Sequence, residues 1–347
     1  MPFSRHRRTL TSGLCTAIGS LPHRDERAAA QFALAATPHL PSIPSLPKRS
    51  PAESMIAQAV VGIRGVSIGQ YGSLLVDAAS VSPVAPVTTD LDNDAFAGMR
   101  AFLDAVKLMK ANDSQPFEIP AVKWQFTGPV TLGLALVRAG VPESTAFDVA
   151  VRTVRTHVRH IFEAVAEVLP HAQQVVFIDE PELGELMDES FAIAPDIAID
   201  LMSGALAAVE HEAIAGLHCC ADIEIAPLLA AGPSVLSVPV RDSLVDDAGQ
   251  IAKFLHNGGT IAWGVVPTDG PMTTTPERSW RKLTALWTEL VRAGCDPTLL
   301  HRQALVTPAC GLALHSESSA TRIIEHVSDI GERIRSTDPT SRYTVGA

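Results

Sequence analysis

The sequence contains no apolar run close to the roughly 20 residues that a transmembrane helix needs. A basic cluster at residues 5–8 is followed by a segment, 9–18, that is too short and too polar for the core of a secretory signal. Both absences argue against insertion into a membrane and against export. We therefore expect a soluble cytoplasmic protein that has no membrane partner.

Basic residues are scarce relative to acidic ones. The chain has 27 Lys and Arg against 38 Asp and Glu, so its formal net charge is -11. Nonspecific nucleic-acid binding requires a basic surface, so we expect no nucleic-acid partner. Cysteine is also rare, because five widely spaced residues, an odd number, do not make a disulfide framework. In a reducing compartment, clustered cysteine and histidine more often bind metal.

The sequence is rich in apolar residues, and these occur in a regular pattern. Hydrophobic residues make up 46% of the chain, which is enough for a large core. Short apolar strand patterns alternate with helical patterns, and this alternation favours parallel β-α units. The predicted strands are 14–18, 121–126, 174–178, 213–217, 235–238, 260–263 and 304–306. The main predicted helices are 25–36, 94–109, 144–169, 194–210, 223–230, 248–257, 276–293 and 317–335.

One more strand near 41–43 or near 66 brings the count to about eight. Eight parallel strands with intervening helices define a (β/α)8, or TIM, barrel, so the predicted fold class is α/β. We expect a single barrel domain over 13–336, with flexible ends at 1–12 and 337–347. The alternative is an open doubly wound sheet, which is disfavoured because no Gly-x-Gly-x-x-Gly motif follows the first strand.

His218 and Cys220 stand two residues apart at the end of a predicted strand. Residues i and i+2 of an extended chain face the same side, so both side chains can enter one site while Cys219 points away. Cys310 follows another predicted strand and can add a third ligand, since strand ends meet at one face of a barrel. One imidazole and two thiolates suit Zn²⁺ and leave a position open. On spacing alone, ordinary buried cysteines explain the pattern equally well.

Five short motifs follow one another along the chain: Ile-Gly-Ser-Leu-Pro at 18–22, Phe-Thr-Gly-Pro-Val-Thr at 126–131, Ile-Asp-Glu-Pro at 178–181, His-Cys-Cys at 218–220 and Pro-Ala-Cys-Gly-Leu at 308–312. In this order they resemble the C-terminal catalytic barrel of the cobalamin-independent methionine synthase family. Its counterparts are Ile-Gly-Ser-Phe-Pro, Leu-Thr-Gly-Pro-Val-Thr, Ile-Asp-Glu-Pro, His-x-Cys and Pro-Asp-Cys-Gly-Leu. The wider superfamily also holds zinc-dependent coenzyme M alkyltransferases and metal-free uroporphyrinogen decarboxylases.

The resemblance implies a zinc-dependent methyltransferase that acts on a small-molecule thiol. His218, Cys220 and Cys310 would hold the zinc, and the zinc would bind the acceptor's thiol. A coordinating metal deprotonates a thiol whose pKa is ordinarily about 8.5, which makes the sulfur a nucleophile. The activity would belong to methionine biosynthesis if the acceptor is homocysteine.

The resemblance also assigns the substrate residues. Asp179 would recognise the acceptor's amine, with Glu180 beside it, and backbone N–H groups around Gly19 and Ser20 would bind its carboxylate. From the residues alone, Asp179 is equally well explained as a helix N-cap. The segment 127–129 is expected to be a structural turn that starts the next helix.

Three departures from the family pattern change the expected chemistry. Pro239 stands where the family has a glutamate zinc ligand, so Asp242 or Glu224 replaces it or zinc has three protein ligands. Asp269 stands where the family has a histidine that relays protons, and a carboxylate can also do this. The family's glutamate for the homocysteine amine is not visible around residues 65–70.

The family's second, N-terminal barrel has no counterpart in this chain, which leaves the methyl donor open between 5-methyltetrahydrofolate and a methyl-corrinoid. The absence of the family's amine-binding glutamate and of its proton-relay histidine also leaves two alternatives to homocysteine methylation. One is alkylation of another thiol, such as coenzyme M, and the other is a degenerate barrel that binds a ligand without turnover. A homodimer is a further expectation.

Overall fold

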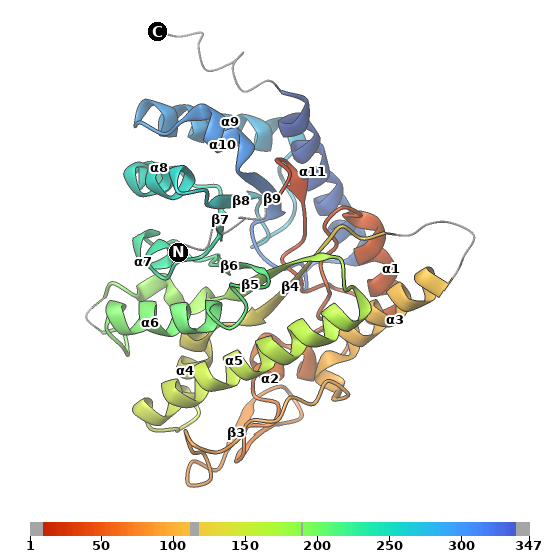
Figure 1. Cartoon of the computed structure of the whole chain (residues 1–347), viewed down its shortest axis with the longest axis vertical. Helices are drawn as coiled ribbons and strands as arrows, with labels where there is room; N and C mark the ends of the chain where they lie inside the picture. Colours follow the sequence, from red (N-terminus) through yellow and green to blue (C-terminus); the bar gives the residue numbers. More distant parts are fainter. Residues whose placement is uncertain (1–9, 112–117, 189, 338–347) are drawn as a thin grey trace, which may run out of the picture.

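The computed structural model describes residues 10–111, 118–188 and 190–337. Nearly all of the two expected flexible ends therefore lies outside the described residues. Within the described part, the main body is a parallel sheet that curls, with helices along its outer side (Figure 1). Among the described residues, every helix is either too short or too polar to span a bilayer.

The seven-stranded sheet has the order β1-β9-β8-β7-β6-β5-β4, and all of its pairings are parallel. From β4 to β9 each strand lies next to its successor, whereas the doubly wound alternative requires a reversal of strand order. All the strands predicted from residue 119 onward are confirmed. The strands are β1 (Leu14–Cys15), β4 (Ala121–Thr127), β5 (Gln173–Asp179), β6 (Ile214–His218), β7 (Val235–Pro239), β8 (Thr260–Val266) and β9 (Ala304–Pro308).

The segment 41–45 lies between the two edges of this sheet. The backbone N–H of Ile43 donates to the Lys123 carbonyl over 2.8 Å, and the N–H of Leu21 donates to the Ser45 carbonyl over 2.9 Å. Two isolated parallel bridges, Ser42 with Lys123 and Ser20 with Ser45, accompany these bonds. Of the two predicted positions for an additional strand, the one near 41–43 is therefore in the expected place.

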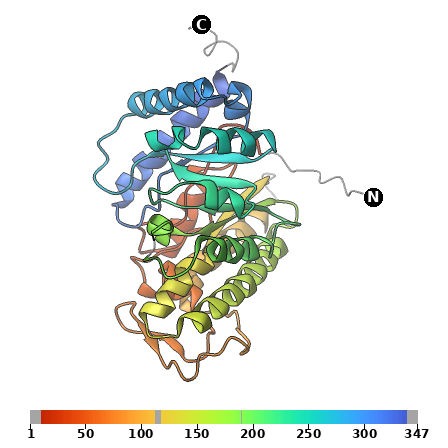
Figure 2. The same cartoon turned by 90° about the vertical axis from the view of Figure 1, so that its left-hand side faces the viewer.

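The other predicted position, near residue 66, belongs to a separate antiparallel hairpin of β2 (Val66–Ile68) and β3 (Leu74–Val76). This hairpin extends from one end of the molecule in both views (Figures 1 and 2). His157 anchors its base, with Nδ1 bonded to the Thr89 hydroxyl at 2.8 Å and Nε2 to the Val61 carbonyl at 2.9 Å. Burial lowers the pKa of His157 to about 4, so the imidazole is neutral and Nε2 donates.

Local signals explain most of the helices. The Asp25 side chain accepts the Ala28 N–H at 2.8 Å and begins α1 as an N-cap. The predicted helix over 223–230 is shorter, because Pro227 fits only the first turn. The helices are α1 (Glu26–Ala36), α2 (Met55–Ala59), α3 (Ala97–Ala111), α4 (Pro129–Arg138), α5 (Glu143–Val168), α6 (Pro195–Leu206), α7 (Ala226–Ala230), α8 (Ala248–His256), α9 (Pro276–Arg292), α10 (Pro297–Arg302) and α11 (Glu317–Ser336), with 3₁₀ turns η1 (Pro51–Glu53), η2 (Asp94–Phe96), η3 (Pro181–Glu185) and η4 (Asp242–Val245).

The sheet has an apolar core on each face. The larger core fills the space between the sheet and the helices. A smaller one packs against the inner face, and strand residues near the amino-terminal ends supply most of it. This arrangement leaves the carboxyl-terminal half of the inner face for polar side chains. The inner core comprises Ile18, Leu40, Ala121, Val175, Phe177, Ile214, Val235, Ala262 and Leu305.

A buried carboxylate fixes the start of α4. The Glu180 side chain is fully buried, and its oxygens accept the N–H groups of Val130 at 2.9 Å and Thr131 at 2.7 Å. A negative charge is favourable at a helix N-terminus, where these N–H groups lack intrahelical partners. The carboxylate lies so close to Gly128 that a Cβ there would stand 2.1 Å from Glu180 Oε1. The structural turn predicted at 127–129 is confirmed.

Gly128→Ala should therefore destabilise the fold by about 1–3 kcal/mol, because the added methyl group pushes Glu180 away from the start of α4. Urea unfolding followed by circular dichroism measures the change. Gly249→Ala is the matched control, since a Cβ at this α8 position meets nothing within 4 Å. That control should leave stability unchanged or raise it by up to about 1 kcal/mol. Equal stabilities for the two variants would contradict this account of the α4 cap.

Candidate metal centre

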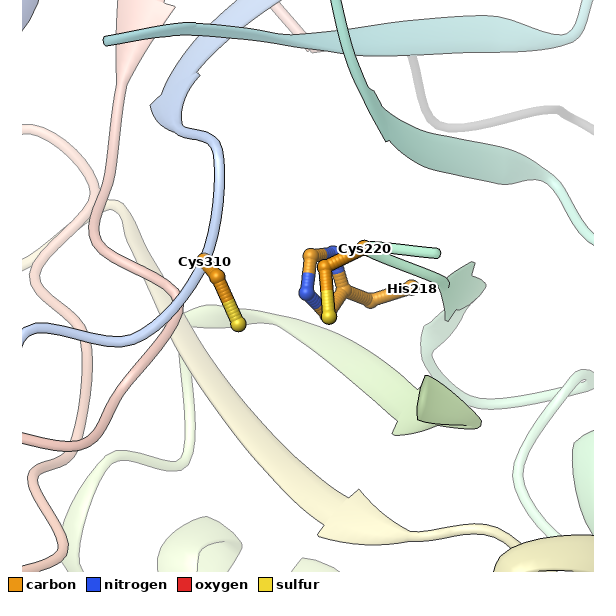
Figure 3. Close-up of side chains that lie close together, drawn as sticks. All are labelled: His218, Cys220 and Cys310. Atoms are coloured by element: carbon orange, nitrogen blue, oxygen red, sulfur yellow. The ribbon is translucent and has the colours of Figure 1, made fainter. Parts of the chain in front are cut away.

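His218, Cys220 and Cys310 come together at the carboxyl-terminal ends of the strands (Figure 3). Their ligand atoms all lie within 4.8 Å of one another. His218 ends β6 and Cys220 follows it in the turn, so the two side chains share a side as the spacing predicts. Cys310 comes from the turn after β9. The structure thus brings the predicted ligand set into one place.

Backbone hydrogen bonds hold both turns that carry the sulfurs. The Cys219 N–H donates to the Ser237 carbonyl at 3.1 Å, which fixes the turn after β6 against β7. The Ala309 N–H donates to the Val266 carbonyl at 2.8 Å, which fixes the turn after β9 against β8. The sulfurs of Cys220 and Cys310 are therefore held by sheet geometry and do not depend on free loops.

The two nitrogens of His218 have different environments. Nδ1 lies 3.0 Å from the Ser237 hydroxyl, whereas Nε2 is buried and has no hydrogen-bond partner among the described residues. A buried polar atom without a partner costs free energy, and a bound ligand would remove that cost. A proton on Nδ1, donated to Ser237, leaves the Nε2 lone pair free for a metal. One imidazole and two sulfurs are the donor set that zinc accepts, so the residues fit this metal.

The three neighbouring thiols differ in acidity. A hydrogen bond from Cys310 lowers the pKa of Cys220, while the same bond and burial raise the pKa of Cys310. In this pair Cys220 is the more acidic residue, and its thiolate accepts a hydrogen bond from the Cys310 thiol. Cys219 is fully buried in the outer core, and burial raises its pKa to about 12. This confirms that Cys219 points away from the centre.

Gly19 and Ser20 lie beside the turn that carries Cys310. The Leu312 N–H donates to the Ser20 carbonyl at 2.8 Å, and a Cβ on Gly311 would stand 2.0 Å from the Ser20 hydroxyl oxygen. Gly19 has a φ of +144°, and a Cβ there would stand 2.0 Å from Gln125 Cδ. The positive φ of Gly19 favours glycine there, and at both positions a Cβ would force the Gln125 or Ser20 side chain to move.

Asp179 ends β5 and pairs in register with His218. Its Oδ1 atom is buried and has no hydrogen-bond partner among the described residues. Burial raises the pKa of Asp179 to about 6, against the opposing influence of His218 and Lys123. The structure therefore places a second unpartnered polar atom next to the ligand group.

Glu180 differs from Asp179, because both of its oxygens already bind the start of α4. Burial raises the pKa of Glu180 to about 7, and the hydrogen bonds from Thr131 and Val130 oppose this rise. The structure gives this side chain a structural contact, and its expected contact with substrate stays a prediction.

Asp269, predicted to handle protons, lies exposed in the loop between β8 and α9. The described residues give its carboxylate no hydrogen bond or ion pair, so its role also stays a prediction. Pro239 ends β7 and has no ligand atom. Asp242 and Glu224 are both exposed, and neither belongs to the ligand group found among the described residues. Of the predicted alternatives, the geometry favours three protein ligands.

Sequence reasoning missed three polar residues of the inner face: Lys123, Gln125 and Ser237. Lys123 is fully buried, and its Nζ donates to the Ile18 carbonyl and, over 2.9 Å, to Gln125 Oε1. The signal was present in β4, where lysine and glutamine alternate with the outward-facing Trp124 and Phe126. A period of two with polar residues on one face indicates a polar inner surface.

No known protein-family profile matches the chain, and no curated protein sequence matches it. Solved structures do. A B12-independent methionine synthase from Shewanella sp. W3-18-1, in complex with selenomethionine, matches with a TM-score of 0.61 over 93% of this chain and 98% of that chain. The chain shares its fold with this methionine synthase.

A methyltransferase from Methanosarcina mazei matches with a TM-score of 0.56 over 94% of this chain and 95% of its own. Both proteins are 14% identical to this chain, so the comparison establishes the fold. The family resemblance read from the motifs is supported at this level, over nearly the full length of all three chains.

Ser237→Ala should weaken the binding of Zn²⁺ about 10- to 100-fold, because it removes the hydroxyl that orients His218. Competition with a chromophoric chelator measures the affinity. Ser234→Ala is the matched control, since Ser234 is exposed just before the same strand. An unchanged affinity in a folded Ser237→Ala protein would show that the hydroxyl does not orient a ligand.

Proposed function

We propose that the protein is a zinc-dependent methyltransferase that transfers a methyl group to a thiol acceptor similar to homocysteine. The observation that carries the proposal is the convergence of a His218 ring nitrogen with the sulfurs of Cys220 and Cys310, because these three ligand atoms all lie within 4.8 Å of one another. Other buried histidine nitrogens also lack partners, including those of His301 and His326, but among the described residues only His218 stands in a group with two cysteine sulfurs. The shared fold with a methionine synthase and a methyltransferase supports the same reading.

In this proposal His218, Cys220 and Cys310 hold zinc. Zinc with one imidazole and two thiolate ligands would lower the pKa of an acceptor thiol in its open position and keep that sulfur nucleophilic. The chain's own residues orient the acceptor. Asp179 has a buried oxygen free to accept a hydrogen bond from the acceptor's amine, and the backbone at Gly19 and Ser20 adjoins the Cys310 turn.

The proposal includes a closed (β/α)8 barrel. The segment 41–45 bonds to Lys123 of β4 and to the backbone of residues 19–21, which follow β1, and it would supply the eighth strand. Closure places the carboxyl-terminal ends of all strands around one mouth, where the unpartnered atoms of His218 and Asp179 lie. Asp269, on the rim, would exchange protons with solvent in this arrangement.

The methyl donor is either 5-methyltetrahydrofolate or a methyl-corrinoid. The Shewanella chain is covered over 98% of its length, so its fold does not extend much beyond that of this chain. That structure of a B12-independent methionine synthase is therefore of nearly the same extent as the chain described here. Incubation of the zinc-loaded protein with homocysteine and each donor in turn, followed by mass spectrometry of methionine, tests both donors.

A second candidate is alkylation of a different thiol, such as coenzyme M. Pro239 favours it, because the family's glutamate ligand is absent and the group found in the described part of the chain has three protein ligands. Methyl transfer to coenzyme M and none to homocysteine would select this candidate. A zinc-loaded protein that binds a thiol and transfers no methyl group from either donor would instead indicate a ligand-binding barrel without turnover.

Cys220→Ser should lower the zinc content from about one equivalent to well below half, because a hydroxyl is a much poorer ligand than a thiolate. Elemental analysis of the purified protein measures it. Cys219→Ala is the matched control and should keep its zinc, since Cys219 lies in the outer core. Full zinc occupancy in the Cys220→Ser protein would count against the proposed ligand set.

Asp179→Asn should weaken homocysteine binding about 10- to 100-fold while zinc content is kept, because the amide cannot pair with a cationic amine. Calorimetric titration of the zinc-loaded protein measures the affinity. 3-Mercaptopropionate lacks the amine and serves as the control ligand, whose affinity should change little. Equal losses for both thiols would argue that Asp179 does not recognise the amine.

A further inference from the structure

Lys123 is a fully buried amine at the level of the inner core, and burial lowers its pKa to about 7. Its side chain is 0% exposed and its Nζ lies 4.8 Å from the centroid of the Phe177 ring. No carboxylate among the described residues lies within ion-pair distance of Nζ. Burying a lysine amine without an ion-pair partner is costly in either protonation state, so the hydrogen bonds that it makes need an account.

The hydrogen bonds of Lys123 all lead toward one loop. Nζ donates to the carbonyl of Ile18, the residue directly before Gly19, and to Oε1 of Gln125 at 2.9 Å. Gln125 in turn packs directly under Gly19, where it fills the space that a Cβ would need. Lys123 therefore supports the Gly19–Ser20 backbone from below through two separate contacts.

The backbone of Lys123 also connects β4 to the segment 41–45. Its backbone N–H donates to Pro41 at 2.9 Å and its carbonyl accepts from Ile43 at 2.8 Å. The segment 41–45 makes only isolated bridges there, so regular strand pairing does not fix the loop. The Lys123 side chain, which reaches from β4 to the Ile18 carbonyl, can fix the Gly19–Ser20 loop instead. An ammonium donates up to three hydrogen bonds, which suits this junction of β1, β4 and the segment between them.

We propose that Lys123 is a positioning residue that acts through Gln125 and the Ile18 carbonyl to hold the Gly19–Ser20 backbone in place for an anionic group on the acceptor thiol. The inference rests on the proposed function, because it assumes that a thiol binds at the metal centre. Its new content is that a buried lysine of β4, not itself in contact with the acceptor, sets the preference for thiols that carry a negative charge.

Two thiols that differ only in the charged end test the proposal. 3-Mercaptopropionate carries a carboxylate, and 3-mercaptopropan-1-ol replaces it by a hydroxyl. Calorimetric titration of the zinc-loaded full chain gives both affinities. Lys123→Met should weaken 3-mercaptopropionate about 10-fold or more, leave 3-mercaptopropan-1-ol within about 2-fold, and retain zinc. A merely structural role would weaken both thiols equally, so equal losses, or no loss, would overturn the proposal.

Gln125→Met is the second variant, and it keeps Lys123 while it removes the contact to Gly19. It should produce the same selective loss, and an unchanged preference for the anionic thiol would refute the action through Gln125.

Gln174→Leu is the matched control, because Gln174 is buried and bonded to Trp124 on the outer face of the same strand pair. If the wild-type protein binds no zinc or neither thiol, the proposed function fails. If wild type binds both and the variants do not differ from it, only this inference fails.

Discussion

The approach of Cys310 to His218 and Cys220 depends on the curl of the sheet. In the strand order, β7 and β8 lie between β6 and β9. Strands in a flat sheet are about 4.8 Å apart, so three steps would separate the two strand ends by about 14 Å. The ligand atoms nevertheless lie within 4.8 Å of one another. The cluster of His218, Cys220 and Cys310 is therefore a product of curvature, and loss of the curl would separate its sulfurs.

The inner face of the sheet divides into an apolar half and a polar half. The apolar side chains collect toward the amino-terminal ends of the strands and stabilise the curl from within. His218, Ser237 and Asp179 collect at the carboxyl-terminal ends, where burial leaves two of their atoms without partners. Unpartnered polar atoms above a packed core are energetically unfavourable in isolation, and a bound ligand would relieve that cost.

Two of the five motifs contact each other. Glu180, from Ile-Asp-Glu-Pro, binds the start of α4, and Gly128, from Phe-Thr-Gly-Pro-Val-Thr, leaves the space for its carboxylate. This contact fixes the end of β5, and with it Asp179, relative to β4. Two adjacent residues of one short motif thus have different contacts. Glu180 binds the start of α4, whereas the Oδ1 atom of Asp179 has no partner among the described residues.

The sequence by itself determined the features that depend on local periodicity: where the strands lie and which side of a strand each residue faces. A period of two placed His218 and Cys220 on one side and Cys219 on the other, and alternating patterns located the strands from β4 to β9. It could not determine which distant side chains meet. The contact between Glu180 and α4, the burial of Lys123 and the position of 41–45 depend on strand order and curl, and these follow from the packing of the whole chain. The tertiary structure alone decided that Cys310 reaches the other two ligands while Asp242 and Glu224 do not, because only the folded sheet sets distances between residues far apart in sequence.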